Sequence, residues 1–388
     1  MTQSADGYPV LVTGGYGNFG RRVVEQLVAA GQFRVLVAGR ARDKAQALAD
    51  RVSRGQPGAA TGIFFDVGGP ALGERLSATG ARLVIHTAGP FQGQDYDLAR
   101  ACIAAGIHYL DLADGRDFVA GIGALDTAAA EAKVSVLCGV STLPALSSVV
   151  VDRFSRRFAT LQRVRYGIVP GYRAERGAAT LRGVLSYVGK PIPVWRGGQW
   201  QTGYGWQELH RADYGARLGR HWQGLCDVPD LLLFPQRYPG IQEISFYAGI
   251  ELAPLHLALW SMSWLVRGRL VRNWRRYARL IDWVGHRFDR FGSADGGMLM
   301  VLEGTGADGA PLTVRWMLFA PDGVGPYIPT IPALLLARDF AAGSEPDSGA
   351  RPALGLFSLE RFLEQAAAFA IVDEARVNGE LVESALAP

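Results

Sequence analysis

Over roughly the first 145 residues, short apolar runs alternate with segments in which apolar side chains recur every three to four positions. The runs are typical of strands and the spaced segments of helices. The expected strands are Pro9–Val12, Phe33–Ala38, Gly62–Asp66, Arg82–Thr87, His108–Leu112 and Val134–Cys138. The expected helices are Gly20–Ala30, Asp43–Val52, Leu72–Ala78, Tyr96–Ala105 and Phe118–Ala132. Such alternation with short connections predicts a parallel, doubly wound sheet with right-handed crossovers.

From Ser141 onward this alternation ends, and glycine, tryptophan, tyrosine and proline become dense between Gly167 and Tyr247. The expected strands there are Val164–Val169, Ile244–Ala248, Met298–Glu303 and Leu312–Ala320, and the last two flank a hairpin at Gly304–Pro311. The expected helices are Ala178–Val188 and Ser358–Ala370, the latter capped by Ser358, and Ser344–Pro352 is loop-like. We therefore expect an α/β protein with two domains, residues 1–146 and an α+β domain of residues 147–388.

The turn after the first expected strand is rich in glycine. Gly15, Gly17 and Gly20 have the spacing of the dinucleotide fingerprint, and Gly14 with the last two satisfies a looser variant. These glycines allow a tight turn, a close approach of main chain to a pyrophosphate and close packing of helix on strand. The pyrophosphate then lies at the positive end of the helix. The residues expected to bind it are Gly14, Gly15, Tyr16, Gly17, Asn18, Phe19 and Gly20.

The end of the second expected strand indicates which dinucleotide binds. An NAD site has a carboxylate there that accepts hydrogen bonds from the adenine ribose. This chain has Arg40, followed by Arg42, and a guanidinium suits a 2′-phosphate. We therefore expect NADP(H), with Asp66 and Val67, which end the third strand, at the adenine. A solvated arginine and an aspartate that caps the following turn stay open as alternatives.

The ends of the fourth and fifth strands are expected to face the nicotinamide. The turn after the fourth strand adds four residues to the expected cofactor site: Thr87, Ala88, Gly89 and Pro90.

The opening turn, the run Thr87–Phe91 and the stretch from Tyr96 to Asp114 together resemble the NADP-binding domain of the saccharopine dehydrogenase family. Residues 325–332 and 349–352 are similar to the family's bacterial oxidoreductases. The resemblance implies an N-terminal Rossmann domain and a second α+β domain for substrate contacts and dimerisation. It also implies that the C-terminal stretch, residues 352–388, returns to the first domain.

Two departures from the family pattern bear on the substrate. Saccharopine reductases usually carry Asp-Pro-Gly after the sixth strand, where this chain has Ser141–Ser147, and a tyrosine at the position of Phe91. The second domain is crowded with tryptophan and leucine rather than with cationic and hydroxyl groups. A hydrophobic small molecule is therefore expected in place of saccharopine.

Hydride transfer requires a positioned acceptor and a proton donor, and three residues are candidates for this chemistry. They are Asp114 after the fifth strand, Tyr96, and Arg176, which with Arg173 can hold a carboxylate, a phosphate or a thioester carbonyl. Each has a structural alternative: a cap or surface pair for Asp114, helix packing for Tyr96 and solvent exposure for Arg176. No metal site is expected, because the six histidines lack metal-ligand spacing.

The segment Leu252–Phe291 combines leucine, tryptophan and valine with eight arginines against Asp282 and Asp289. It predicts one or two amphipathic helices, broken near Gly268. A basic face opposite tryptophan and leucine is typical of a helix that lies on a membrane surface. A tunnel for an acyl chain, a dimer contact and a helix packed on the core stay open. No nucleic acid is expected, because no recognition fold accompanies the charge.

Composition restricts the remaining choices only slightly. The net charge is +4, and almost all the positive charge is arginine. The three cysteines lie far apart, which predicts reduced thiols and a cytoplasmic protein, with membrane association as a further option. The N-terminus has no signal-peptide pattern, and no apolar run reaches the roughly 18 residues that a membrane span needs.

Together these observations predict an NADPH-dependent oxidoreductase, a homodimer that reduces a C=N, C=O or C=C bond of a small hydrophobic metabolite. A reductase serving a carrier-bound acyl or polyketide chain is one alternative. A non-catalytic, nucleotide-binding adaptor at a membrane surface is the other.

Overall fold

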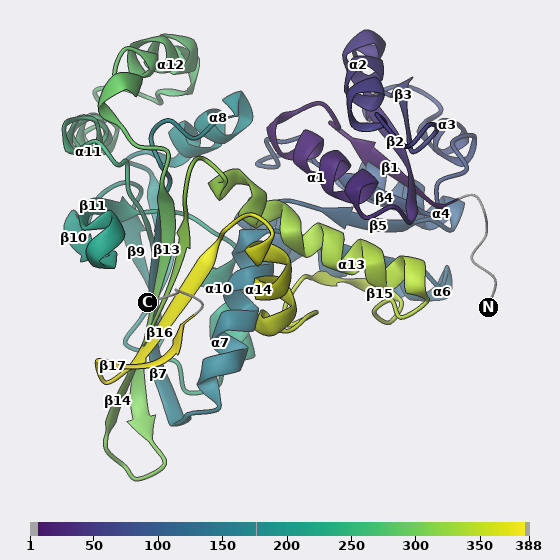
Figure 1. Ribbon diagram of the computed structural model, residues 1–388. Coiled ribbons are helices and arrows are strands. Elements are labelled where there is room, and N and C mark those ends of the chain that lie inside the picture. The colour runs from purple at the N-terminus through teal and green to yellow at the C-terminus, as the bar shows by residue number, and fades with distance from the viewer. Residues whose placement is uncertain (1–6, 176, 385–388) are drawn as a thin grey trace. The chain divides into compact units, whose positions relative to one another are not determined.

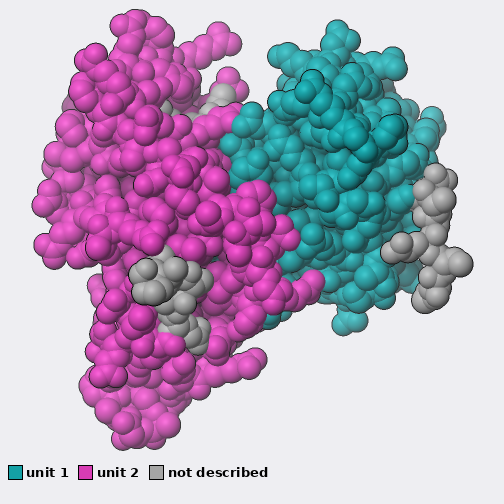
Figure 2. Space-filling view, in the orientation of Figure 1, with its two compact units in different colours: residues 1–146, 327–358 teal, residues 147–326, 359–388 magenta. Residues whose placement is uncertain are grey.

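A computed structural model describes residues 7–175 and 177–384 (Figure 1). The chain divides into two compact units (Figure 2). The first comprises Met1–Leu146 and Tyr327–Ser358, and the second comprises Ser147–Pro326 and Leu359–Pro388. The segment that returns to the first unit is therefore 327–358. Most of the expected stretch 352–388 belongs to the second unit, because helix α14 (Leu359–Ala367) and strand β16 (Val372–Val377) pack there.

The first unit contains a parallel seven-stranded sheet with the order β15-β6-β5-β4-β1-β2-β3. Its strands are β1 (Tyr8–Thr13), β2 (Phe33–Gly39), β3 (Ala60–Phe64), β4 (Leu83–His86), β5 (His108–Asp111), β6 (Ser135–Cys138) and β15 (Gly349–Pro352). Its helices are α1 (Asn18–Ala29), α2 (Arg42–Val52), α3 (Leu72–Ser77), α4 (Asp97–Ala105), α5 (Arg116–Gly121), η1 (Ile122–Leu125), α6 (Asp126–Glu131), η2 (Thr142–Leu146), η5 (Gly325–Thr330) and α13 (Ile331–Ala342). The predicted doubly wound sheet is confirmed.

Two details of this unit differ from the prediction. The expected helix Phe118–Ala132 is three short helices, since Gly121 and Gly123 weaken a continuous helix. The expected loop Ser344–Pro352 ends in strand β15, which pairs in parallel with β6. Its sequence, Gly-Ala-Arg-Pro, has no apolar alternation, so the open edge of β6 selects it as a strand.

The second unit contains a mixed ten-stranded sheet whose main path is β10-β11-β12-β7-β13-β14-β16-β17, with β8 paired to β12 and β9 paired to β8. Its strands are β7 (Phe158–Val169), β8 (Pro191–Arg196), β9 (Gln199–Tyr204), β10 (His210–Asp213), β11 (Arg220–Leu225), β12 (Glu243–Ala248), β13 (Gly296–Gly306), β14 (Pro311–Ala320), β16 and β17 (Glu380–Ser384). Its helices are α7 (Ser147–Ser155), α8 (Ala178–Tyr187), α9 (Gly215–Leu218), α10 (Asp230–Arg237), α11 (Ala253–Arg267), η3 (Arg275–Tyr277), α12 (Ala278–His286), η4 (Asp289–Phe291) and α14.

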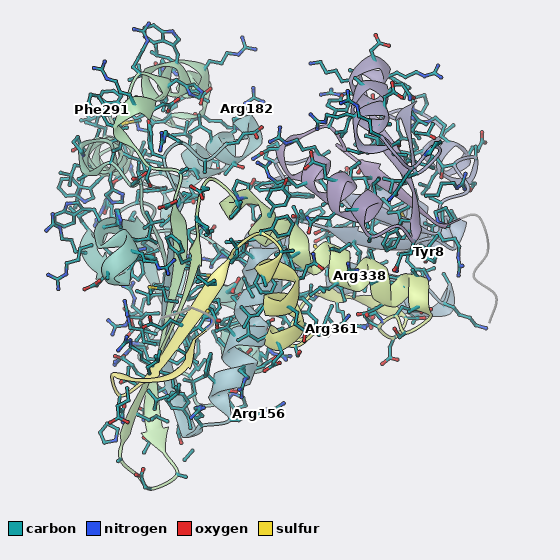
Figure 3. The ribbon with its side chains drawn as sticks, viewed as in Figure 1. Tyr8, Arg156, Arg182, Phe291, Arg338 and Arg361 are labelled. Atoms are coloured by element: carbon teal, nitrogen blue, oxygen red, sulfur yellow. The ribbon has the colours of Figure 1, made fainter. Side chains whose placement is uncertain are left out.

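One face of this second sheet is covered by α7, α10 and α14. Tyr166 of β7 stacks there on Phe234 of α10 at 6.3 Å between ring centroids. The neighbouring Arg165 points to the other face, because successive strand residues alternate, and pairs with Glu303 at 3.1 Å. Outside the sheet, α11 ends at Arg267, next to Gly268, where the sequence predicted a break, and Figure 3 labels Phe291 beside α11 and α12.

Candidate dinucleotide site

The strand order of the first sheet reverses at β1 and β4, which lie side by side. Their carboxyl ends are joined because Thr87 donates two hydrogen bonds to the Thr13 carbonyl oxygen, from its main-chain N–H at 3.0 Å and its hydroxyl at 2.8 Å. In open α/β sheets, ligands bind beyond the strand ends at such a switch point. The glycine-rich turn leaves β1 at this place.

The glycines of this turn differ in what surrounds them. A Cβ on Gly20 would lie 2.2 Å from the Gly14 carbonyl oxygen, so helix α1 could not begin so close to the turn. Gly14 has a φ of +71°, and a Cβ on Gly15 would lie 2.9 Å from the Val12 carbonyl oxygen. A Cβ on Gly17 would meet only the Gly14 carbonyl oxygen, at 3.0 Å, and Gly17 is exposed. Gly17 therefore leaves room for a ligand, and the other three serve the fold.

Helix α1 begins at Asn18 without a side-chain cap at Gly17 and without an acidic residue in its first turn. Its first N–H groups and the positive end of its dipole therefore suit an anion. Asn18 and Phe19 are half-buried. The Asn18 side chain accepts a hydrogen bond from Arg22, whose guanidinium adds positive charge at this end. The cradle fits the pyrophosphate of a dinucleotide.

Tyr16 connects the glycine turn with the end of β2. A Cβ on Gly39 would lie 2.3 Å from the Tyr16 ring, and the Tyr16 hydroxyl accepts a hydrogen bond from the Ala41 N–H at 3.0 Å. The neighbouring Arg40 and Arg42 are exposed, and no hydrogen bond or ion pair to either guanidinium is found within residues 7–175 and 177–384. Tyr16 therefore shapes the loop that presents two available guanidinium groups.

Asp66 shows the structural role that the sequence left open. Its Oδ1 accepts a hydrogen bond from the Gly68 N–H at 3.2 Å, and its carbonyl oxygen accepts one from Arg75 at 2.9 Å. Asp66 thus caps the turn after β3, and Val67 lies half-buried beside it. An adenine contact from this pair stays a prediction.

The turn Thr87–Pro90 is half-buried and is held by a residue that the sequence did not single out. The Gln94 amide donates hydrogen bonds to the carbonyl oxygens of Ala88 at 3.0 Å and Pro90 at 2.8 Å. Beneath the turn, His86 is bonded to the Thr13 hydroxyl at 2.7 Å, and burial lowers the pKa of His86 to about 4. Neutral His86 and Gln94 therefore fix the loop.

The loop after β5 lies against the loop after β4, and the two are bonded through Gln92, which donates to the exposed Asp114 carboxylate at 3.1 Å. Asp111, at the end of β5, is instead fully buried. Its carboxylate accepts hydrogen bonds from the N–H groups of Ala113 at 3.0 Å and Gly139 at 2.7 Å. Burial raises the pKa of Asp111 to about 6. Asp111 anchors the two strand ends, and Asp114 is the exposed carboxylate of the two.

Tyr96 and Arg176 are the other two candidates for the proton-donating or substrate-holding role. The Tyr96 hydroxyl donates a hydrogen bond to the Phe118 carbonyl oxygen at 2.7 Å, and burial raises the pKa of Tyr96 to about 12. This geometry favours the packing role over proton donation. Arg176 lies outside the described residues, and its neighbour Arg173 is exposed.

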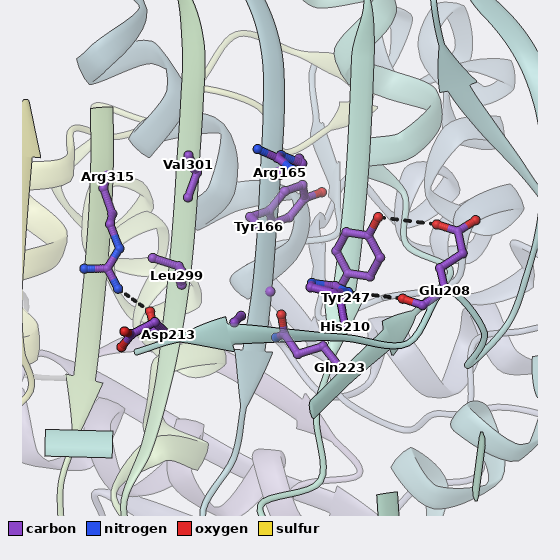
Figure 4. Close-up of a pocket in the computed structure, with 12 residues that line it drawn as sticks. Arg165, Tyr166, Glu208, His210, Asp213, Gln223, Tyr247, Leu299, Val301 and Arg315 are labelled. Atoms are coloured by element: carbon purple, nitrogen blue, oxygen red, sulfur yellow. Dashed lines mark hydrogen bonds between the residues drawn. The ribbon is translucent and has the colours of Figure 1, made fainter. Parts of the chain in front are cut away.

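The second unit carries a cavity of about 470 Å³ on the open face of its sheet (Figure 4). His210 packs edge-on against Tyr247 at 4.3 Å between ring centroids, and the Tyr247 hydroxyl bonds to Glu208 at 3.3 Å. Arg315 donates to the Asp213 carbonyl oxygen. These polar groups already bind one another, and Gly167 is the single glycine among the lining residues, so the cavity does not resemble a dinucleotide site with its glycine-rich turn.

Comparison with known proteins agrees with the geometry of the first unit. Residues 10–137 match the family model described as Saccharopine dehydrogenase NADP binding domain. Residues 10–137 are therefore similar to the NADP-binding domain of the saccharopine dehydrogenase family, and this likeness supports an NADP-dependent oxidoreductase with NADP(H) as its cofactor. No curated protein matches the chain.

Among solved structures, the saccharopine dehydrogenase (L-Glu forming) of Saccharomyces cerevisiae is similar with a TM-score of 0.65 and 14% identity, over 96% of this chain and 100% of that one. This likeness shows a shared fold. The hydroxysteroid dehydrogenase of Escherichia coli has a TM-score of 0.29 and 16% identity, over 40% of this chain and 80% of that one. The alcohol dehydrogenase of Thermococcus sibiricus has a TM-score of 0.23 and 14% identity, over 27% of this chain and 57% of that one. The last two support no argument about function.

Proposed function

We propose that this oxidoreductase uses NADPH to reduce a C=N, C=O or C=C bond of a small, hydrophobic metabolite. The observation that carries the NADPH part is the open space at Gly17 beside an uncapped helix, with exposed Arg40 and Arg42 next to it. A pyrophosphate suits the first feature and a 2′-phosphate the second.

Bound NADPH would supply the hydride. The chain's own residues bind and orient the cofactor: Gly17 and the start of α1 hold the pyrophosphate, and the turn Thr87–Pro90, braced by Gln94, supports the nicotinamide side. Asp114 is the proposed proton donor or substrate anchor, because it is exposed in the adjoining loop. Tyr96 and Arg176 stay as secondary proposals.

The hydrophobic preference rests on the residues that replace the family's polar ones. Phe91 has no hydroxyl to offer a polar substrate. Its buried ring packs on His86 at 5.3 Å and on Phe118 at 5.4 Å between ring centroids. The segment Ser141–Ser147 brings no carboxylate. Homodimer formation and a cytoplasmic location are proposals that follow from the family resemblance and the cysteine pattern.

Titration of the protein with NADPH and NADH tests the first part. We expect NADPH to bind at least about tenfold more tightly than NADH, because a charge-assisted contact to the 2′-phosphate contributes about 1.5–3 kcal/mol. If neither nucleotide binds below millimolar concentration, the proposal fails.

A panel of ketones, imines and enoyl compounds of increasing alkyl length tests the second part. Each buried methylene contributes about 0.8 kcal/mol, so kcat/KM should rise about fourfold per methylene until the site is filled. Faster reduction of polycarboxylates would contradict the hydrophobic assignment. Turnover confined to carrier-bound thioesters would favour the carrier-bound alternative, and tight NADPH binding without turnover of any compound would favour the adaptor.

A further inference from the structure

The segment from Leu252 to Phe291, called here the α11–α12 segment, contains two helices with different surroundings. Helix α11 packs in the ordinary way, with His256, Leu259 and Val266 buried against the second unit. Its packed face accounts for those buried side chains, and α12 is the helix whose whole apolar stripe needs a further explanation.

Helix α12 turns its apolar stripe outward. Leu280, Trp283 and Val284 follow the i, i+3, i+4 spacing of one helix face and are 57%, 57% and 41% exposed. A different side packs on the protein, because the Gly285 carbonyl oxygen accepts a hydrogen bond from the Tyr172 hydroxyl at 2.8 Å and Ala278 is buried. An amphipathic helix in a globular domain normally buries its apolar stripe.

Further apolar side chains of the same segment are exposed as well. Leu270 is 77% and Phe291 61% exposed, and Trp264 and Leu265 are 46% and 39% exposed. Soluble proteins rarely expose so many large apolar side chains within one segment unless a partner covers them.

The charge of the segment indicates the nature of that partner. The segment contains eight arginines and two aspartates, so its net charge is +6. Arginines also lie over the exposed aromatic rings: Arg287 over Trp283 at 4.3 Å, Arg290 over Phe291 at 4.6 Å and Arg276 over Tyr277 at 4.7 Å. Each pair places an apolar ring beside a cation, the arrangement that suits the boundary between lipid chains and phosphate headgroups.

We propose that the α11–α12 segment docks on an anionic membrane surface, with Leu280, Trp283 and Phe291 entering the headgroup region and the arginines binding lipid phosphates. A second copy of this chain fits less well, since a symmetric contact would oppose two surfaces of charge +6. Nucleic acid would satisfy the arginines but would leave the leucines exposed. Among the residues that the structure describes, no helix is long and apolar enough to cross a membrane. The docking proposal goes beyond the reductase assignment and does not depend on it.

Flotation of the full-length protein with vesicles tests the proposal. We expect recovery with vesicles of phosphatidylcholine containing about 30% phosphatidylserine at roughly 0.1 M salt, and little recovery with phosphatidylcholine alone or at 0.5 M salt, because salt screens the attraction.

Two variants separate the apolar and the cationic contributions. Leu280→Ser with Trp283→Ser should lower the partition coefficient at least about tenfold, since both side chains leave the interface. Arg276→Gln with Arg279→Gln should lower it about 25-fold, because each arginine near an anionic surface contributes about fivefold. The matched controls are Trp200→Ser, an exposed tryptophan outside the segment, and Arg34→Gln in the first unit, and both should bind like wild type.

Circular dichroism and NADPH affinity should be unchanged in all four variants, which separates lost docking from lost folding. Failure of the wild type to float with anionic vesicles overturns the proposal. So does a concentration-dependent oligomer that the Leu280→Ser and Trp283→Ser pair abolishes, because the surface would then be a protein interface.

Discussion

Helices α1 and α12 carry apolar residues at the same helical spacing, but only one of them hides its stripe. In α1, Val24, Leu27 and Val28 are buried in the first unit, and what stays open is its amino end. In α12, Leu280 and Trp283 are exposed. The pattern of a helix thus shows that a face is apolar without showing what covers it. In this chain, groups covered by their own unit serve the fold, and uncovered groups are the ones we assign to partners.

The largest effect expected from this contrast is on stability, and it distinguishes Leu27 of α1 from Leu280 of α12. Leu27→Ala should lower the free energy of unfolding by about 2–5 kcal/mol, because it leaves a cavity in a fully buried position. Leu280→Ala should change it by no more than about 0.5 kcal/mol. Urea unfolding followed by circular dichroism measures both. Equal losses would mean that α12 is covered in solution, and the contrast would disappear.

The next largest effects are expected from alanine substitutions at Gly20, which should lower stability, and at Gly17, which should weaken NADPH binding. Gly20→Ala should destabilise the protein by about 1–3 kcal/mol or more, because the new methyl group meets the Gly14 carbonyl oxygen at 2.2 Å. Gly17→Ala should leave the melting temperature nearly unchanged but weaken NADPH binding at least about tenfold, since the methyl group occupies ligand space. Gly73→Ala, with open space around it in α3, is the control and should bind NADPH normally. Normal binding by Gly17→Ala would remove the pyrophosphate from this turn.

The buried Asp111 extends the contrast to polar groups. Asp111→Ala should cost about 2 kcal/mol or more, because the N–H groups of Ala113 and Gly139 lose their acceptor, and Asp111→Asn can keep both bonds. Thermal melts of the two variants measure this difference. A loss in Asp111→Asn as large as in Asp111→Ala would show that the charge matters more than the acceptor.

The shifted pKa of Asp111 also makes the stability of the protein depend on pH. The pKa of Asp111, about 6 in the fold, lies above the usual value of about 3.9, so the folded state binds more protons and stability falls as pH rises from about 4 to 6. The pKa of His86, lowered to about 4, acts in the opposite direction, and stability rises with pH between about 4 and 6.5. The two slopes partly cancel in the wild type. Melting temperature should therefore rise more steeply with pH in Asp111→Asn than in wild type, and parallel curves would contradict the Asp111 shift.

The smallest expected effect concerns the exposed Arg40. Arg40→Ala should weaken NADPH binding about tenfold, near 1.4 kcal/mol, and leave NADH affinity and stability unchanged, because the side chain has only a ligand to bind. Arg34→Ala, an exposed arginine at the other end of β2, is the control. Equal losses for both nucleotides would assign Arg40 to something other than the 2′-phosphate.

Much of the first domain and the location of its candidate cofactor site was predictable, because both depend on local sequence patterns. Each buried strand is a short apolar run, and Gly14 to Gly20 form one continuous stretch, a turn and the start of α1, whose glycine spacing is itself the recognition pattern. The structural anchors of the site were less accessible. Gln94 bonds to Ala88 and Pro90 and Asp111 to Gly139, and neither side chain has a local pattern that reveals such pairs.

Most of the second domain required the structure. Strands β8 to β11 contain proline, glycine, tryptophan and charged residues without clear alternation, since their exposed face tolerates either kind of residue. The predicted strand Val164–Val169 is the C-terminal half of the longer strand β7, and Met298–Glu303 is the middle part of the longer strand β13.

By itself, the sequence determined the parallel sheet, the glycine turn, the arginine after β2 and the amphipathic character of residues 252–291, because each depends on neighbours within about one helix or strand. Only the tertiary structure decided that residues 327–358 return to the first unit, that Tyr96 is bonded to Phe118 and that α12 faces outward. Those outcomes depend on contacts between residues far apart in the chain, and such contacts are selected by packing rather than by local pattern.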